Sequence, residues 1–178
     1  MAKETLCLPD QVSQILSEIG GEIYDEFKGD KFPIVVGIQS GGMRVARCLE
    51  EVFLEMGVER VVVGSVDTTL YRDDIHRLLP SKGLLPMELP VSIEDEAILL
   101  VDDVIFTGRS ARAAMDALFC LGRPRLVRLA VLVDRGHREL PIQPDYCGFV
   151  VETSYRDTVE VMWGDLGGEI IVVRENGV

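Results

Sequence analysis

Apolar and amphipathic segments alternate along most of the chain. The run IVVGI at 34 to 38 carries no polar side chain, which is typical of a strand buried on both faces. Before it, residues 10 to 27 repeat Val, Ile and Leu every three or four positions, which predicts a helix capped by Asp10. The same pairing recurs, so we expect strands over 34–38, 61–66, 97–101 and 126–133 and helices over 10–27, 42–56 and 108–121. Such alternation predicts an α/β fold, a mostly parallel sheet with helices on both faces.

The end of the chain has a different pattern. Two apolar runs, VEVMW and EIIVV, flank the glycine-rich residues 164 to 168, which predicts a C-terminal hairpin. A long polar stretch with prolines lies between the strands that end near Leu70 and begin near Ala97. Segments of that length are usually functional, so we expect a lid, with a simple surface excursion as the alternative. No repeat or linker divides the chain, so residues 1–178 are expected to form a single domain.

Composition and charge exclude several classes of partner. The formal net charge of −12 is spread along the 178 residues, which argues against general attraction to nucleic acid or anionic lipid. The four cysteines form no CxxC pair, which indicates reduced core residues of a cytosolic protein rather than metal ligands. The sequence shows neither a basic and apolar leader nor an apolar run of membrane-spanning length. We therefore expect a cytoplasmic protein with no membrane partner.

The stretch ILLVDDVIFTGRS, residues 98 to 110, carries the strongest chemical signal. A parallel strand that ends at Val101 would deliver Asp102 and Asp103 to the carboxyl edge of the sheet, where open α/β sheets bind ligands. The turn that follows opens a helix, so its amides and hydroxyls form an anion cup from Thr107, Gly108, Arg109 and Ser110. A ligand that satisfies both would carry a phosphate at one end and hydroxyls or a metal ion at the other. Ribose 5-phosphate fits this description.

Other readings of the same residues are weaker. The paired aspartates alone could be a solvated strand end, and Thr-Gly alone could be a helix entry, but here the two are contiguous. A P-loop nucleotidase is excluded because the chain has no GxxxxGK[ST], and no GxGxxG anchors a dinucleotide. A phosphoacceptor receiver domain would need a lysine on a later strand, and the last lysine of this chain is Lys82.

Three segments, in order, carry a resemblance to a known family. They are DTTLYRDD (67–74), VDDVIFTGRSARAAMDAL (101–118) and LAVLVDRGHRELPI (129–142). Together they resemble the bifunctional pyrimidine operon attenuator and uracil phosphoribosyltransferase family, over roughly residues 34–153. The resemblance implies a type I phosphoribosyltransferase fold and a homodimer or higher homo-oligomer. It also implies Mg²⁺-dependent conversion of uracil and phosphoribosyl diphosphate to uridine monophosphate (UMP) and pyrophosphate.

The resemblance also assigns roles to residues on the ribose and phosphate side. Asp102 and Asp103 would lie near the ribose hydroxyls and the metal ion, and residues 107–110 would hold the 5-phosphate. The pyrophosphate loop would comprise Ser40, Gly41, Gly42 and Arg44. The family usually has an arginine where this chain has Gly41 or Gly42, so whether Arg44 replaces it is left open.

Two further groups of residues would act on the base and on the leaving group. Backbone groups of Val133, Asp134 and Arg135 would read the uracil edge, although Arg135 could instead fold the connection over the core. Negative charge develops on the departing pyrophosphate, so we expect cations in the lid to stabilise it. The candidates in the sequence are Arg72, Arg77 and Lys82, and we take Arg72 as the catalytic candidate.

Two alternatives to a uracil phosphoribosyltransferase stay open. The first is a uridine-nucleotide-sensing, RNA-binding attenuator with weak enzyme activity, and the second is a phosphoribosyltransferase for another base. RNA affinity depends on lysine and arginine, yet residues 1–33 hold seven acidic residues against three lysines. The remaining basic candidates are Arg123, Arg125, Arg128, Arg135 and Arg138. Charge therefore disfavours RNA as a partner without settling the question.

Overall fold

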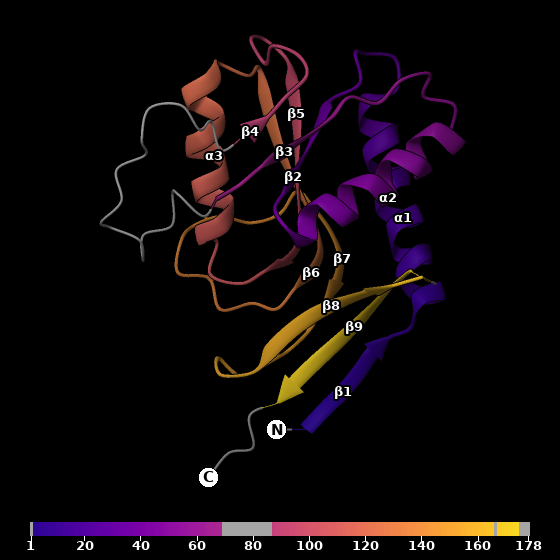
Figure 1. Ribbon diagram of the computed structural model, residues 1–178, viewed down its shortest axis with the longest axis vertical. Coiled ribbons are helices and arrows are strands. Elements are labelled where there is room, and N and C mark those ends of the chain that lie inside the picture. The colour runs from indigo at the N-terminus through magenta and orange to yellow at the C-terminus, as the bar shows by residue number, and fades with distance from the viewer. Residues whose placement is uncertain (1, 69–86, 166, 175–178) are drawn as a thin grey trace.

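A central six-stranded sheet organises the computed structural model, which describes residues 2–68, 87–165 and 167–174 (Figure 1). Its order is β4-β3-β2-β5-β6-β7, and its strands are β2 (Ile34–Ile38), β3 (Val63–Val66), β4 (Met87–Glu88), β5 (Ala97–Ile105), β6 (Leu126–Asp134) and β7 (Tyr146–Val150). Every neighbouring pair is parallel except β3 with β4. The predicted mostly parallel sheet is therefore confirmed.

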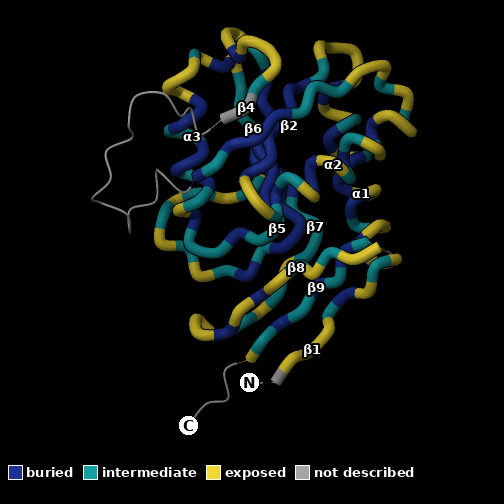
Figure 2. Tube along the Cα trace, viewed as in Figure 1, coloured by how far each residue is buried: buried dark blue, intermediate teal, exposed yellow. Residues whose placement is uncertain are grey.

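Helices cover both faces of this sheet, as the sequence predicted. On one face lie α1 (Pro9–Phe27) and α2 (Gly41–Glu55), and on the other α3 (Arg109–Leu121). Successive strand side chains point to opposite faces, so Leu99 of β5 packs in the cluster of Phe53 from α2, and Leu100 in that of Leu118 from α3. Figure 2 shows the resulting buried band through the centre of the sheet. Because helices cover both faces of the sheet, a ligand can approach it at the strand ends.

A second, three-stranded antiparallel sheet lies at one end of the molecule (Figure 1). It comprises β1 (Ala2–Cys7), β9 (Gly167–Arg174) and β8 (Thr158–Gly164), in the order β1-β9-β8. The predicted hairpin is confirmed as β8 and β9, whose alternate side chains Ile170 and Val172 are completely buried. Strand β1 was not predicted, because its six residues, AKETLC, contain too few apolar positions to show a period.

Strand β5 is longer than the sequence analysis predicted, and this changes the setting of the two aspartates. Its pairing with β6 continues past Val101, with Asp102 opposite Val131 and Ile105 opposite Asp134. Asp102 and Asp103 therefore lie inside the strand instead of beyond its end. The expected end at Val101 was wrong because β6 pairs with three further residues, Asp102, Val104 and Ile105.

Smaller differences concern the start of α1 and one strand. Leu8 is the N-cap of α1, its amide donating to Gln11 Oε1 at 2.9 Å, and Asp10 lies inside the first turn. Proline at the first helical position, Pro9, explains this earlier start. Strand β7 was also not predicted. Among the described residues, no helix is long and apolar enough to cross a membrane. The predicted lid falls largely on residues 69–86, outside the described part of the chain.

Candidate active site

The site predicted from the sequence lies where β2 and β5 run side by side. From β2 the chain moves outward to β3, whereas β5 leads to β6 and β7 on the other side, which makes this pair the topological switch point. In open α/β sheets, ligands bind in the crevice at the carboxyl ends of such a pair. The carboxyl end of β2 leads into α2, and that of β5 into α3, so two helix N-termini flank the crevice.

The glycine turn after β2 touches the acidic pair of β5. A Cβ atom on Gly41 would lie 1.8 Å from Asp103 Oδ2, and one on Gly42 would lie 2.3 Å from the Val101 carbonyl oxygen. Only residues without side chains allow the two segments to approach this closely. The predicted pyrophosphate turn and the predicted acidic pair are therefore direct neighbours.

The turn itself forms the first turn of α2. Ser40 is the N-cap, and Gly41 and Gly42 are the first two helical residues. Amides in a first helical turn have no intrahelical acceptor, and the helix dipole adds partial positive charge there. The turn therefore presents donors suited to an anion. Arg44 lies about one helical turn after Ser40 and is exposed. That it takes the place of the family's pyrophosphate-loop arginine stays a prediction.

Asp102 is buried, contrary to the solvent-facing position expected for both carboxylates. Its exposed fraction is 9%, and burial followed by the neighbouring charge of Asp103 raises its pKa well above the usual value. Asp102 Oδ1 accepts the Asp103 amide at 3.0 Å, and Asp103 Oδ1 accepts the Val104 amide at 2.9 Å. Asp103 is half-buried, so it is the member of the pair more accessible from the crevice.

The predicted phosphate cup opens α3. Gly108 is the N-cap with φ of 89°, a conformation that favours glycine, and Ser110 lies half-buried in the first turn. Thr107 Oγ1 accepts the Arg109 amide at 3.4 Å. The Arg109 guanidinium is directed to Glu139, with Nη2 2.7 Å from Oε2. The turn thus opens a helix as predicted, whereas the Arg109 side chain engages a carboxylate, and phosphate binding by this turn stays a prediction.

The polar groups of Val133 and Asp134 are largely used within the fold. Val133 is completely buried in β6, and the Asp134 carbonyl accepts the Val151 amide at 2.9 Å. The Asp134 carboxylate accepts the Gly136 amide at 2.8 Å and pairs with Arg138. Direct base contacts by these residues therefore stay a prediction.

Arg135 adopts the structural role that the sequence had left open. It is 6% exposed, and its guanidinium lies 4.0 Å from the centre of the Phe106 ring. It donates to the carbonyls of Ser154 at 3.0 Å and Tyr155 at 3.4 Å, while its Nε has no partner. Burial lowers the pKa of Arg135. Its guanidinium thus holds the loop between β7 and β8 close to Phe106, the residue that follows β5.

Three rings that the sequence reasoning did not assign gather at this end of the sheet. Phe106 lies 5.2 Å from Tyr155 and 6.0 Å from His137, centre to centre, and His137 lies 5.8 Å from Tyr155. Each comes from a different loop, so no local motif contains all of them. Phe106 could have been noticed inside the phosphate motif, but for Tyr155 the only signal was an aromatic residue in a polar stretch. Tyr155 is 58% exposed, although its ring packs against both of the others.

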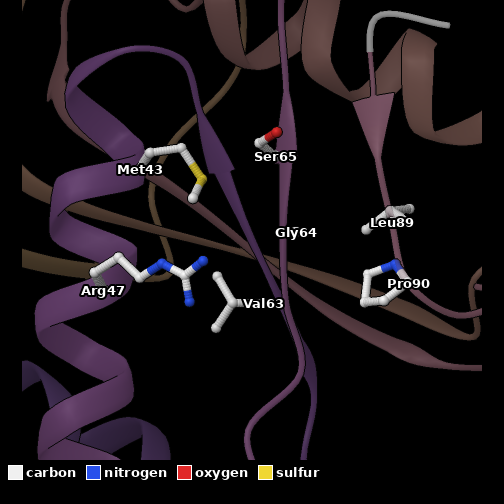
Figure 3. Close-up of a pocket in the computed structure, with 7 residues that line it drawn as sticks. All are labelled: Met43, Arg47, Val63, Gly64, Ser65, Leu89 and Pro90. Carbon is white, nitrogen blue, oxygen red and sulfur yellow. The ribbon is translucent and has the colours of Figure 1, made fainter.

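A separate pocket of about 500 Å³ lies between α2 and the edge of the sheet (Figure 3). Met43 and Arg47 extend from α2 over β3, and the lining is completed by Val63, Gly64, Ser65, Leu89 and Pro90. None of the predicted site residues lines it, although Met43 follows the glycine turn directly. It is therefore adjacent to the candidate site and not part of it.

The donor set of the site fits Mg²⁺ only in part. Within residues 2–68, 87–165 and 167–174, no three His, Cys, Asp or Glu side chains come together to hold a metal ion. Mg²⁺ is commonly held by one or two carboxylates together with substrate phosphates and water. Asp102 and Asp103 fit that pattern if the ligand supplies the remaining oxygens. Arg72, Arg77 and Lys82 lie outside the described residues.

Comparison with known proteins agrees with this geometry. Residues 10–164 match the model of the phosphoribosyl transferase domain. The chain is 43% identical to the bifunctional protein PyrR of Streptomyces coelicolor, over 97% of this chain and 89% of the relative. It is 46% identical to the bifunctional protein PyrR of Alkaliphilus metalliredigens, over 90% of this chain and 89% of the relative.

Solved structures of similar fold include purine phosphoribosyltransferases. A hypoxanthine phosphoribosyl transferase from Trypanosoma cruzi superposes with a TM-score of 0.69 at 21% identity, covering 96% of this chain and 91% of that one. A hypoxanthine-guanine phosphoribosyltransferase from Bacillus anthracis gives 0.67 at 18% identity, covering 87% of each chain. At such identities the likeness shows the fold alone. With the domain match and the close relatives, it follows that this chain belongs to the phosphoribosyltransferase family and, within it, to the bifunctional PyrR proteins.

Proposed function

We propose that the protein transfers the phosphoribosyl group of phosphoribosyl diphosphate to uracil, giving UMP and pyrophosphate. The observation that carries the proposal is the contact between Gly41 and Asp103, which joins the anion-binding turn of α2 to the acidic pair of β5. Together with the cup at the start of α3, it forms one continuous edge of amides, hydroxyls and carboxylates. A phosphorylated ribose with a pyrophosphate leaving group matches the order of these groups.

Each part of the edge has a chemical task in this reaction. The cup at residues 107–110 binds the 5-phosphate, and the amides at the start of α2 bind the pyrophosphate. Asp102 and Asp103 would lie along the ribose and would hold Mg²⁺, which would supply positive charge to the pyrophosphate. Breaking the anomeric bond develops oxocarbenium character on the ribose, so alignment and electrostatic stabilisation supply the catalysis.

Uracil is proposed as the base because the three motif segments resemble the uracil-specific family and because the close relatives are bifunctional PyrR proteins. The test is a screen of uracil, orotate, hypoxanthine and guanine with phosphoribosyl diphosphate and Mg²⁺, following pyrophosphate release. We expect uracil to give the highest kcat/KM. Efficient turnover of a purine or orotate with none of uracil would refute the base assignment and leave the phosphoribosyltransferase assignment standing.

RNA-binding attenuation is the second candidate, and ion pairing weighs against it. Arg125 pairs with Asp30 at 3.2 Å, and Arg128 pairs with Glu26 at 2.9 Å and with Asp145 at 3.4 Å. Arg138 is engaged by Asp134, and Arg135 is buried under Phe106. Four of the five basic candidates named from the sequence thus have acidic partners or are buried. Neutralising an RNA phosphate with such an arginine would first require breaking its ion pair.

We therefore propose enzyme activity as the main function. A gel shift with the pyrimidine operon leader RNA of the source organism, with and without UMP at near-physiological salt, tests this choice. We expect no stable complex. A tight, UMP-enhanced and sequence-dependent complex would show that attenuation is retained.

A further inference from the structure

The Glu139 carboxylate bridges the phosphate cup and the loop between β7 and β8. Its Oε2 accepts from Arg109, at 2.8 Å from Nε and 2.7 Å from Nη2. Its Oε1 accepts the Tyr155 hydroxyl at 2.8 Å. The hydrogen bond from Tyr155 and then that from Arg109 lower the pKa of Glu139, so the bridge is ionised at neutral pH. One side chain thus connects its own loop with the start of α3 and with the loop between β7 and β8.

Backbone contacts fix Glu139 and Tyr155 in place. The Glu139 amide donates to the Thr107 carbonyl at 3.0 Å, which attaches its loop to the cup. The Tyr155 carbonyl accepts from Arg135, and the Tyr155 ring packs against Phe106 and His137. The Tyr155 hydroxyl, by donating to Glu139, ties this exposed ring toward the cup.

We infer that Glu139 is a positioning residue, which acts through Tyr155 to set the base-side wall of the site at a fixed place relative to the phosphate cup. The inference rests on the proposed function, because it assumes that the base enters beside Phe106 and Tyr155 while the 5-phosphate occupies the cup. Reaction requires the attacking base nitrogen to lie in line with the anomeric carbon. Because Glu139 links Tyr155 to the phosphate cup, the base and phosphoribosyl diphosphate are held at a fixed position relative to each other.

A second glutamate in the molecule also bridges an arginine and a tyrosine, but its tyrosine belongs to the core. Glu26 also bridges an arginine and a tyrosine, accepting from Arg128 Nε at 2.9 Å and from the Tyr146 hydroxyl. Tyr146, however, is 6% exposed and belongs to the core, whereas Tyr155 is 58% exposed. Exposed ion pairs contribute little to stability, so the Glu139 bridge is poorly explained by folding alone. Glu26, near the end of α1, contacts β6 and β7 near their amino ends, away from their carboxyl ends, and provides a matched control.

The test is a double-mutant cycle on Glu139→Gln and Tyr155→Phe, with Glu26→Gln as the control. Each variant is assayed for KM of uracil, KM of phosphoribosyl diphosphate, kcat and thermal midpoint. Since misplacement by about 1 Å can lower rates about a hundredfold, we expect each single variant to lower kcat/KM for the base about tenfold. KM for phosphoribosyl diphosphate should change less than about twofold in Tyr155→Phe, because the cup is untouched. The double variant should be no worse than either single variant, as expected for residues that act as one unit.

Additive losses in the double variant would overturn the inference. So would an unchanged kcat/KM for the base in both single variants, or equal losses in Glu26→Gln. A loss that followed the thermal midpoint would assign Glu139 a folding role only, and would equally overturn it. Should the wild type use hypoxanthine instead of uracil, the proposed function fails, but the same cycle run with hypoxanthine still decides the role of Glu139.

Discussion

Replacing Gly41 by alanine should disable the enzyme by displacing one carboxylate. The new Cβ would lie 1.8 Å from Asp103 Oδ2 and 2.2 Å from its Cγ. To reach an ordinary contact of 3.4 Å, the carboxylate must withdraw by about 1.6 Å. The obstacle is the end of a side chain, so the backbone can stay in place. Alanine also favours a helix over glycine by about 0.5–1 kcal/mol, and residue 41 is helical, so the fold should survive.

The expected magnitude follows from that displacement. A misplacement of about 1 Å at a reacting centre can lower the rate about a hundredfold, and each factor of ten corresponds to about 1.4 kcal/mol. Gly41→Ala should therefore lower kcat at least about a hundredfold, or about 3 kcal/mol of transition-state stabilisation. The effect should exceed that of a typical surface substitution because the displaced group is the more accessible member of the acidic pair.

The assay follows pyrophosphate release at saturating uracil and phosphoribosyl diphosphate over a range of Mg²⁺ concentrations. Thermal unfolding of the same samples reports the fold. Gly21→Ala is the matched control, because a Cβ there would meet only Met56 Cε, at 3.9 Å, inside α1. The control should keep wild-type kcat with an equal or higher thermal midpoint. Near-normal kcat in Gly41→Ala would show that the position of Asp103 is not critical and would refute the site.

Three further predictions test the acidic pair, a pH-dependent contact and the core. Asp102→Asn and Asp103→Asn should each lower kcat about a hundredfold or more, near 2–4 kcal/mol, and circular dichroism should show an intact fold. The pKa of Glu26 is lowered chiefly by its hydrogen bond from Tyr146, so its stabilising effect is present above the unfolded pKa of about 4.3 and is lost in more acidic solution. Unfolding midpoints of wild type and Glu26→Gln should thus differ at pH 7 and converge near pH 3, and a constant difference would contradict this. Phe53→Ala should cost about 3–5 kcal/mol in denaturant unfolding, because the ring is completely buried and packs 4.8 Å from a neighbouring phenylalanine ring.

The sequence predicted the central fold well because its strands are buried on both faces. Strand β2 was predicted at its observed bounds, since five residues without a polar side chain have no other stable location. Strand β5 was predicted too short, because two adjacent aspartates were taken to end it. In the structure Asp102 pairs within the sheet opposite Val131, and its burial there raises its pKa. Local polarity could not reveal that the predicted strand over 126–133 pairs with Asp102, through a residue 29 positions further along the chain.

The sequence predicted the helix-opening turns of the candidate site and missed several of its side chains; the binding roles of these residues stay predictions. The turn at residues 40–42 and the cup at residues 107–110 follow from glycines beside strand ends, a local signal. The wall made by Phe106, His137 and Tyr155 depends on three loops whose approach is set by tertiary packing. No spacing rule in a single sequence connects residues 106 and 155.

The relatives are called bifunctional, and the two candidate activities, phosphoribosyl transfer and RNA binding, place different demands on the charge of the protein surface. The candidate active site draws on backbone amides at two helix N-termini and on carboxylates, none of which needs a basic surface. A chain with net charge −12 can therefore keep the site intact. RNA binding requires arginines and lysines available to phosphates, and here Arg125 and Arg128 already face Asp30 and Glu26. Acidic partners at these positions would weaken RNA binding without altering the candidate active site, so the two functions can separate within this fold.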